Sequence, residues 1–223
     1  MNILAFDTSG AVCAAAVLRG GVLAARRAAP MERGHAQALV PMLAEAMAES
    51  GLGFDALDAV GVTVGPGAFT GIRIGLATAR GIGLAAALPV YGVTGFAAIA
   101  AAVPDSLLAQ ATLLVAIESR REEIFVQLFG PARRVLSEPR SIRVEDLAAW
   151  LPPGECVLAG DAAPRAAAGL AKQPAASVDT ARSPDPAIVA RLAGARWESG
   201  ERPPPPAPFY LRAPDVTLAA DAR

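Results

Sequence analysis

A glycine-rich stretch at residues 62–99 constrains the fold more than any other part of the chain. Ala59 to Val64 is an apolar, β-branched run, which predicts a buried strand. Gly65-Pro66-Gly67 ends this strand, because proline cannot donate a hydrogen bond to a sheet and glycine accepts positive φ. Thr70 is then placed to cap a helix that runs to about Ala87. The pattern predicts a strand, a tight turn and a helix in direct succession.

The predicted helix after the turn is rich in small residues. Gly75, Gly81 and Gly83 lie inside it, and each costs about 1 kcal/mol relative to alanine. One series of small residues recurs with i+4 spacing: Gly71, Gly75, Ala79, Gly83 and Ala87. Such a ridge lets another backbone come very close. Two interpretations remain open, since the ridge can pack tightly inside its own domain or form a docking face for a partner protein.

The chain before this stretch predicts three strands and a helix. The strands are Ile3–Asp7, Val12–Leu18 and Val22–Ala28, and Arg19-Gly20-Gly21 is a good hairpin turn between the last two. A helix is predicted at Gly34–Ser50. Its apolar face consists of Leu39, Met42, Leu43, Ala46 and Met47. Pro41 removes a helical hydrogen bond, so the regular helix begins close to it or has a kinked first turn.

After the helix, a short strand at Val90–Val93 precedes a third helix, which Thr94 caps and which extends through Ala102. Further strands are predicted at Thr112–Ile117, Ile124–Phe129 and Cys156–Ala159, and further helices at Val144–Leu151, Pro164–Ala171 and Pro186–Ser199. Residues 203–208 read PPPPAP and predict a stiff polyproline spacer. Phe209 to Leu211 is expected to dock on the protein, and the last ten residues are expected to be loose.

Composition excludes several classes of protein. The chain is 53% hydrophobic and 18% charged, which is typical of a globular protein. Its formal net charge of −1 gives no electrostatic footprint for nucleic acid, so the chain alone should bind RNA weakly. Cys13 and Cys156 belong to no metal or disulfide pattern and are expected to be buried. The uncharged run Gly81–Pro104 is interrupted by glycines and Pro89, so we expect no membrane span, and the expected location is the cytoplasm.

Two short motifs are candidate phosphate sites. Asp7-Thr8-Ser9 follows a strand, as does the first phosphate loop of actin-like kinases, in which the acid positions a hydrated magnesium ion. The turn at Gly67 lacks the lysine of a P-loop, because Ile72 stands in its place. Backbone N–H groups at the helix start could still hold an anion, with Arg73 as the helper. The candidate anion or nucleotide contacts are therefore Asp7, Thr8, Gly67 and Arg73.

Catalytic machinery is not evident in the sequence. His35 is the only histidine, so any histidine-based triad must use it, and no nucleophile can be placed beside it from sequence. Metal sites of the relevant enzymes need a histidine pair or a histidine with assembled carboxylates. We therefore expect no metal and no other cofactor.

Four segments resemble the TsaB (also called YeaZ) family: ILAFDTS, GHAQALVPML, GPGAFTGIRIG and PFYLR. They occur in the family's order and cover the first hundred residues best. The resemblance implies an α/β fold of the actin-like or RNase H-like (ASKHA) type, with two subdomains that each have a mixed sheet and flanking helices. The expected division is 1–103, 104–202 and a proline-rich linker and tail at 203–223. Glu118 is a departure, because the family typically has an aspartate there.

The resemblance also implies a function. TsaB proteins pair with the catalytic subunit TsaD, joined by the ATPase TsaE, in making threonylcarbamoyladenosine on tRNA, and tRNA would be bound only through the complex. TsaD proteins hold metal on two histidines four residues apart, whereas Leu39 stands four after His35 here. The chain is thus expected to be a non-catalytic scaffold. An actin-like kinase or ATPase that uses Asp7 is the main alternative, and a glycopeptidase has little chemical basis here.

The expected interface with TsaD lies on two helices. The first contributes Leu39, Met42, Leu43, Ala46 and Met47, and the second contributes Gly71, Gly75, Ala79 and Gly83. In the absence of the partner the same surface is expected to form a homodimer.

Overall fold

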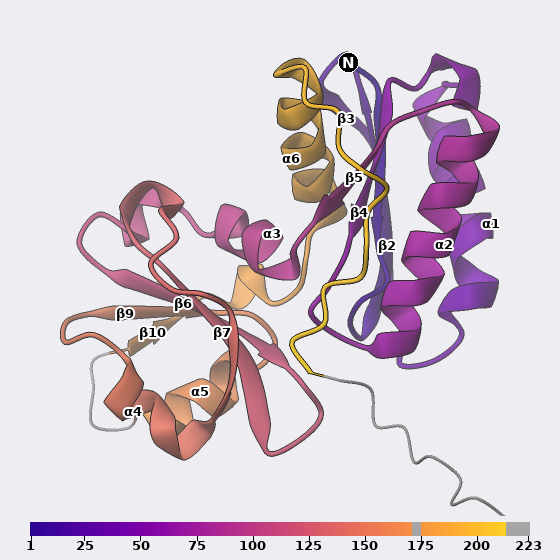
Figure 1. The fold of residues 1–223 in the computed structure, drawn as a ribbon. Helices are drawn as coiled ribbons and strands as arrows, with labels where there is room; N and C mark the ends of the chain where they lie inside the picture. Colours follow the sequence, from indigo (N-terminus) through magenta and orange to yellow (C-terminus); the bar gives the residue numbers. More distant parts are fainter. Residues whose placement is uncertain (171–174, 213–223) are drawn as a thin grey trace, which may run out of the picture.

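The computed structural model describes residues 1–170 and 175–212, which form two lobes, each built on a five-stranded sheet (Figure 1). The first sheet has the order β3-β2-β1-β4-β5. Its strands are β1 (Ile3–Asp7), β2 (Val12–Arg19), β3 (Val22–Pro30), β4 (Ala59–Thr63) and β5 (Val90–Val93). β1, β2 and β3 pair antiparallel, whereas β4 lies parallel to both β1 and β5. The sheet is therefore mixed, as predicted.

Helices cover both faces of the first sheet. Successive residues of a strand point to opposite faces, and both sets are apolar in the central strands, so each face needs a covering layer. Leu4 and Phe6 of β1 pack in the cluster that includes α1 (His35–Ser50) and α2 (Phe69–Ala85). Ile3 and Ala5 pack in the cluster that includes α6 (Pro186–Glu198). In Figure 1, α1 and α2 lie on the side of the first lobe that faces away from the second lobe.

The second sheet has the order β10-β9-β6-β7-β8. Its strands are β6 (Thr112–Glu118), β7 (Glu123–Phe129), β8 (Arg140–Arg143), β9 (Cys156–Ala159) and β10 (Ala175–Ser177). The cluster on one face includes α3 (Gly95–Ala102), and the cluster on the other includes α4 (Leu147–Trp150) and α5 (Ala163–Gly169). Short 3-10 helices are η1 (Phe54–Ala56), η2 (Asp105–Leu107), η3 (Pro131–Arg133), η4 (Val144–Asp146) and η5 (Asp179–Ala181).

Local signals at two helix starts gave opposite results. Thr94 caps α3 as predicted, since its hydroxyl accepts a hydrogen bond from Ala97 N at 3.1 Å. The prediction for Thr70 is wrong, because α2 already begins at Phe69 after Ala68, which makes no side-chain cap bond. The helix also ends at Ala85 rather than Ala87, which has φ 53°. The sequence did not predict the two edge strands of the second sheet, because β8 is mostly polar and β10 is only three residues long.

The two lobes exchange helices, which the predicted division at residues 103 and 202 did not anticipate. α3 precedes the second sheet in sequence and packs on it, whereas α6 follows the second sheet and packs back on the first. We call β1–β5 with α1, α2 and α6 the first lobe, and β6–β10 with α3, α4 and α5 the second lobe. The lobes are thus joined by chain crossings before α3 and before α6.

The proline run after α6 is not an isolated spacer. Pro206 O accepts a hydrogen bond from Arg80 Nη2 at 2.6 Å, and Phe209 N donates to Val64 O at 2.8 Å. The segment therefore returns along the first lobe, and Phe209 packs against the cores of both lobes, which confirms the predicted docking. The predicted loose tail, residues 213–223, lies outside the described residues. In the described part of the chain, no helix has the length and apolar character needed to cross a membrane.

Candidate functional site

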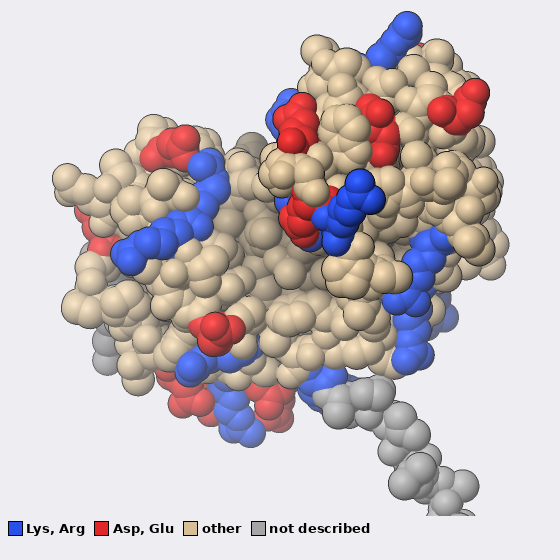
Figure 2. Space-filling view, turned by 45° about the horizontal axis from the view of Figure 1, so that its top comes forward, with Lys and Arg blue, Asp and Glu red and all other residues tan. Residues whose placement is uncertain are grey.

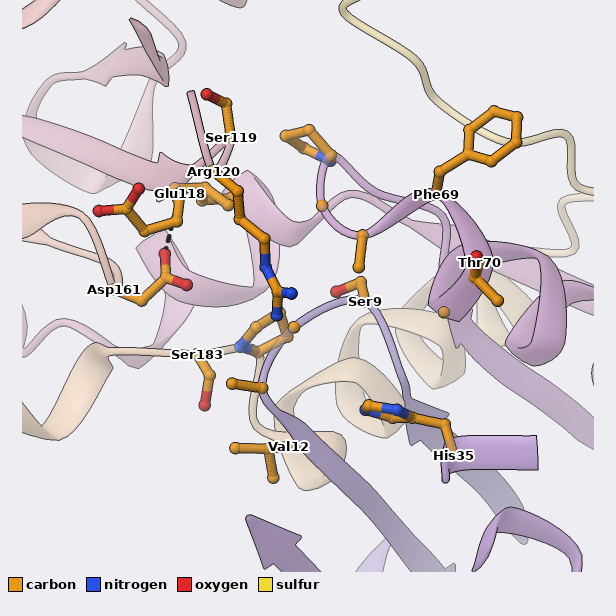
Figure 3. A pocket seen from close by; sticks show the side chains of 18 of the residues that line it. Ser9, Val12, His35, Phe69, Thr70, Glu118, Ser119, Arg120, Asp161 and Ser183 are labelled. Atoms are coloured by element: carbon orange, nitrogen blue, oxygen red, sulfur yellow. Dashed lines mark hydrogen bonds between the residues drawn. The ribbon is translucent and has the colours of Figure 1, made fainter. Parts of the chain in front are cut away.

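A cleft of about 1550 Å³ lies where the two lobes meet (Figure 3). The first lobe contributes the β1–β2 loop at Ser9 and the starts of α1 and α2. The second lobe contributes the β6–β7 turn at 119–121 and Asp161, which follows β9. Residues 209–212 of the returning C-terminal segment complete the wall. The two sheets therefore position these loops and helix starts around one cavity.

Asp7 lies beneath this cleft rather than in its wall. Its side chain is 1% exposed, and Oδ1 accepts hydrogen bonds from Ser9 N at 2.9 Å and Ser9 Oγ at 2.6 Å. Burial raises the pKa of the Asp7 carboxyl, although the two bonds from Ser9 act in the opposite direction. Thr8 is also turned inward, and its hydroxyl donates to Gly71 O at 2.8 Å. Neither residue reaches the cleft as the predicted anion contact requires.

Three buried polar atoms around Asp7 have no hydrogen-bond partner among the described residues. They are Asp7 Oδ2, His35 Nε2 and Thr63 Oγ1. Thr63 and His35 both lower the pKa of Asp7, so they lie near its carboxyl, although the Thr63 hydroxyl does not reach hydrogen-bond geometry. Within the described ranges, no three His, Cys, Asp or Glu side chains are grouped so that they could hold a metal ion.

The glycine turn and the start of α2 are fixed against the β1–β2 loop. A Cβ atom at Gly67, which has φ 155°, would lie 2.2 Å from Ser9 O, and one at Gly71 would lie 2.0 Å from Thr8 O. Ala68 N donates to Ser9 O at 2.7 Å. The predicted anion contact at Gly67 is therefore filled by the chain's own backbone. Glycine is needed here because only a residue without a side chain permits this close approach.

Arg73 lines the cleft but is held by two aromatic residues. Its guanidinium lies 3.6 Å from the centroid of the Phe69 ring, and its Nε donates to the Tyr210 hydroxyl at 3.1 Å. Phe69 and Tyr210 stack with ring centroids 4.9 Å apart. Arg73 therefore lines the cleft, but the partners of its side chain lie in this stack and not at the Gly67 turn, and its role as an anion contact stays a prediction.

The small-residue ridge of α2 faces the protein's own sheet. A Cβ at Gly75 would lie 2.7 Å from Thr8 Oγ1, and one at Gly83 would lie 2.5 Å from Val90 Cγ2. Gly71 and Ala79 are buried on the same side. The geometry therefore supports packing inside the first lobe, and these residues do not offer a surface to another protein as predicted.

The apolar face of α1 is internal as well. Leu39, Leu43, Ala46 and Met47 are buried in the core of the first lobe, and Met42 is half-buried at its edge. An amphipathic helix normally packs its apolar face against the core of its own domain, as α1 does here. The predicted partner interface is therefore corrected, because most of its residues are buried in the first lobe. Only the outward faces of α1 and α2 remain accessible.

Two carboxyl groups of the second lobe, Glu118 and Asp161, line the cleft; of these, the sequence singled out only Glu118, as a departure from the family pattern. Asp161 Oδ1 accepts a hydrogen bond from Glu118 N at 2.9 Å, and Glu118 Oε2 pairs with Arg165 Nη1 at 2.6 Å. Burial raises the pKa of Asp161. Asp7 is the last residue of β1 and Asp161 lies just after β9, and this shared position of an acid at a strand end could have revealed Asp161.

The chain is similar to known proteins in sequence and in fold. The family model described as TsaD, tRNA N6-adenosine threonylcarbamoyltransferase, matches residues 22–178. An uncharacterized protein of Mycobacterium tuberculosis is 34% identical over 218 residues, 96% of this chain and 93% of that protein. The tRNA threonylcarbamoyladenosine biosynthesis protein TsaB of Haemophilus influenzae is 36% identical over 126 residues, 56% of this chain and 52% of that protein.

The solved structure of YeaZ from Pseudomonas aeruginosa matches with a TM-score of 0.79 and 27% identity, covering 94% of this chain and 99% of that chain. A dehydratase activator from Clostridium difficile, at 10% identity and a TM-score of 0.51, shares the fold alone. The predicted actin-like fold is confirmed. The chain belongs to the family that the matching model describes, and within that family it is a member of the TsaB (YeaZ) group.

Proposed function

We propose that this chain is the non-catalytic partner of a TsaD-type transferase in the synthesis of threonylcarbamoyladenosine on tRNA. The curated TsaB relatives carry this pathway in their names. In the proposed assembly the TsaD-type subunit transfers the threonylcarbamoyl group, and a TsaE-type ATPase joins the pair. This chain supplies a structural surface.

The position of Leu39 is the observation that carries the proposal. TsaD-type enzymes are expected to hold metal on two histidines four residues apart in this helix. Here Leu39, four residues after His35, is 0% exposed in the core of the first lobe. A buried leucine supplies no ligand, and a single imidazole is a poor substitute for the pair. This argument supports a partner role over a second transferase.

The main alternative, an actin-like kinase, is less compatible with the site. Such an enzyme needs Asp7 to face the cleft and position a metal ion. The Asp7 carboxyl is instead 1% exposed and accepts two hydrogen bonds from Ser9. The proposal therefore keeps Asp7 as a structural residue.

A surface suited to a partner lies on the outward sides of α1 and α2. On α1, exposed residues without charge recur with i+4 spacing, and they are Ala36, Val40, Ala44 and Ala48. On α2 the corresponding series is Ala77, Gly81 and Ala85. Leu84, beside that series, is 86% exposed. We call these eight residues the outer face.

Gly81 distinguishes the outer face from an ordinary solvent-exposed helix surface. A Cβ atom there would meet nothing within 4 Å, so no internal contact requires glycine. A glycine inside a helix nevertheless costs about 1 kcal/mol relative to alanine. Close approach by a helix of another chain is the physical explanation that we propose.

Charge distribution supports binding of tRNA through the complex. The chain has a formal net charge of −1. On the face shown in Figure 2, basic and acidic side chains are interspersed on a largely uncharged surface. Because phosphate contacts dominate RNA affinity, this surface alone is expected to bind tRNA weakly.

Reconstitution tests the proposed function. Purified TsaD-type and TsaE-type proteins, tRNA and threonylcarbamoyl-adenylate would be combined with and without this chain, and modified adenosine measured by mass spectrometry. The expected result is modification only when the chain and the TsaD-type protein are both present. Full modification without this chain, or modification by this chain alone, contradicts the proposal.

A further inference from the structure

The two chain crossings between the lobes lie side by side. One crossing, at Thr94, leads from β5 to α3, and the other, at 182–185, leads from η5 to α6. A Cβ atom built on Gly95 would lie 3.7 Å from Pro184 Cγ, so the crossings meet at one place. A few connecting residues at one place can act as a hinge. Contacts away from this place are therefore needed to fix how far the two lobes open.

The returning C-terminal segment supplies such a contact. We call residues 206–211 the strap, and in Figure 1 the yellow segment that contains them runs down the first lobe after α6. Tyr210 packs against the core of the first lobe, Leu211 packs against the core of the second, and Phe209 packs against both. These three residues also line the cleft. The strap thus contacts both lobes with consecutive side chains.

Polar contacts fasten the strap to the first lobe. Arg80 Nη2 donates a hydrogen bond to Pro206 O at 2.6 Å, and Phe209 N donates to Val64 O at 2.8 Å. The Tyr210 hydroxyl adds the bond from the α2 arginine described above. Detaching the strap from the first lobe would therefore break several hydrogen bonds at once.

Two glycines let the strap lie directly against the first sheet. A Cβ atom at Gly65, which has φ 112°, would lie 2.7 Å from Phe209 O. One at Gly92 in β5 would lie 3.0 Å from Pro206 Cβ. Pro206 itself is buried. The first lobe is thus shaped to keep the strap in place, because larger residues at these two positions would collide with it.

The contact with the second lobe is of a different kind. Phe209 and Leu211 pack against the apolar cluster that includes α3, and both side chains are only half-buried. Among the described residues, no hydrogen bond joins residues 206–211 to the second lobe. An apolar contact can open without leaving a buried donor or acceptor unsatisfied. The strap is therefore easier to release from the second lobe than from the first.

We propose that the strap restrains the opening of the two lobes and that it does so through the contact of Phe209 and Leu211 with the second lobe. Release of this contact lets the lobes rotate about the crossings at Thr94 and 182–185, while the strap stays on the first lobe. The cleft then widens beside Leu211. This device lies within one chain and does not depend on the proposed function.

Distance measurements by electron paramagnetic resonance test the proposal on the full chain. Arg191→Cys on α6 and Glu138→Cys before β8 provide exposed thiols for spin labels on the two lobes, whereas both native cysteines are buried. A single narrow distribution of label distances is expected. Leu211→Asp should broaden and shift this distribution, because an unpaired carboxylate in an apolar contact is costly.

Two further variants serve as control and second test. Leu107→Asp makes the same change at a 43% exposed leucine of the second lobe, outside the apolar clusters that the strap contacts. It should leave the distance distribution as in the parent. Leu211→Ala removes apolar contact without adding charge, so its distribution should lie between those of the parent and Leu211→Asp. Circular dichroism would verify that every variant folds.

Hydrogen exchange of the Phe209 amide, followed by NMR, tests whether release is confined to the second lobe. In Leu211→Asp this amide should stay protected, because Val64 O still accepts its hydrogen bond. Exchange at the rate of an unprotected amide would show that the whole strap detaches, which contradicts release at one lobe only.

Three distance results would overturn the proposal. They are an unchanged distribution in the folded Leu211→Asp variant, equal broadening by Leu107→Asp and Leu211→Asp, and a parent distribution already as broad as that of Leu211→Asp. The last result would show that the strap does not restrain the lobes.

Discussion

At the residue scale, the most unusual feature is the buried polar cluster of Asp7, His35 and Thr63. Each has a side-chain atom without a hydrogen-bond partner among the described residues. Unsatisfied buried polar groups cost free energy, so such a cluster is expected to destabilise the folded protein. Burial raises the pKa of Asp7 above its usual value of 3.8, because removing the carboxylate from water disfavours its ionised form.

The raised pKa of Asp7 predicts a pH dependence of stability. The unfolded chain releases the Asp7 proton at lower pH than the folded protein, so the free energy of unfolding falls as pH rises from about 3.8 toward the folded pKa. Asp7→Asn keeps an acceptor for Ser9 and removes the titration. Urea unfolding across this range should show a steeper loss in the parent than in the variant.

Other acids titrate in the same range, and Asp161 also has a raised pKa. They contribute equally to the parent and the Asp7→Asn variant, so the difference between the two curves isolates Asp7. Parallel curves would show that Asp7 titrates alike in the folded and unfolded states.

At the element scale, α2 has two sides with opposite requirements for small residues. Gly71 faces the β1–β2 loop, where a Cβ would lie 2.0 Å from the backbone oxygen of Thr8. Gly81 faces solvent, where a Cβ would meet nothing within 4 Å. The same residue type in one helix therefore serves internal packing at one position and leaves an open surface at the other.

This contrast predicts opposite effects of one substitution. Gly81→Ala should raise the free energy of unfolding by about 1 kcal/mol, because alanine is the better helix former. Gly71→Ala should lower it by about 1–3 kcal/mol, the usual cost of overpacking. Chemical denaturation at low protein concentration measures both. Stabilisation by Gly71→Ala, or a loss with Gly81→Ala, would contradict the described orientation of α2.

The sequence predicted these elements better than their orientation. Continuous apolar runs identified β1, β2 and β4, and apolar residues at helical spacing identified α1. The i+4 series at Gly71 predicted a close approach without indicating what approaches, since periodicity gives a face and not its neighbour. Arg120 could not be predicted as a site residue, because its place depends on how two lobes meet across residues distant in sequence.

At the scale of the whole molecule, the helix exchange and the returning C-terminal segment tie the lobes together. α6 packs on the first sheet after the chain has completed the second, and Phe209 packs against both cores. These connections surround the cleft and leave the outer face of α1 and α2 on the far side of the first lobe (Figure 1). Among the outer-face residues, Ala36 at the start of α1 also lies in the cleft wall, so the two surfaces adjoin at that point.

The outer face is also expected to hold two copies of this chain together when the transferase is absent. A two-fold axis would place the same uncharged surface of each copy against the other, as in most homodimers. A homodimer and the complex with the transferase would then exclude each other. This competition follows from the use of one surface for both partners.

Affinity for the TsaD-type transferase tests the central claim most directly. The chain would be titrated into the transferase by calorimetry, with Ala77→Leu on the outer face and Ala195→Leu on the exposed side of α6 as the matched control. Circular dichroism would verify that both variants fold. Overpacking an interface costs about 1–3 kcal/mol, so Ala77→Leu should weaken binding by roughly ten-fold or more. Ala195→Leu should bind like the parent. If the folded Ala77→Leu variant binds as tightly as the parent, the partner does not dock on the outer face of α1 and α2.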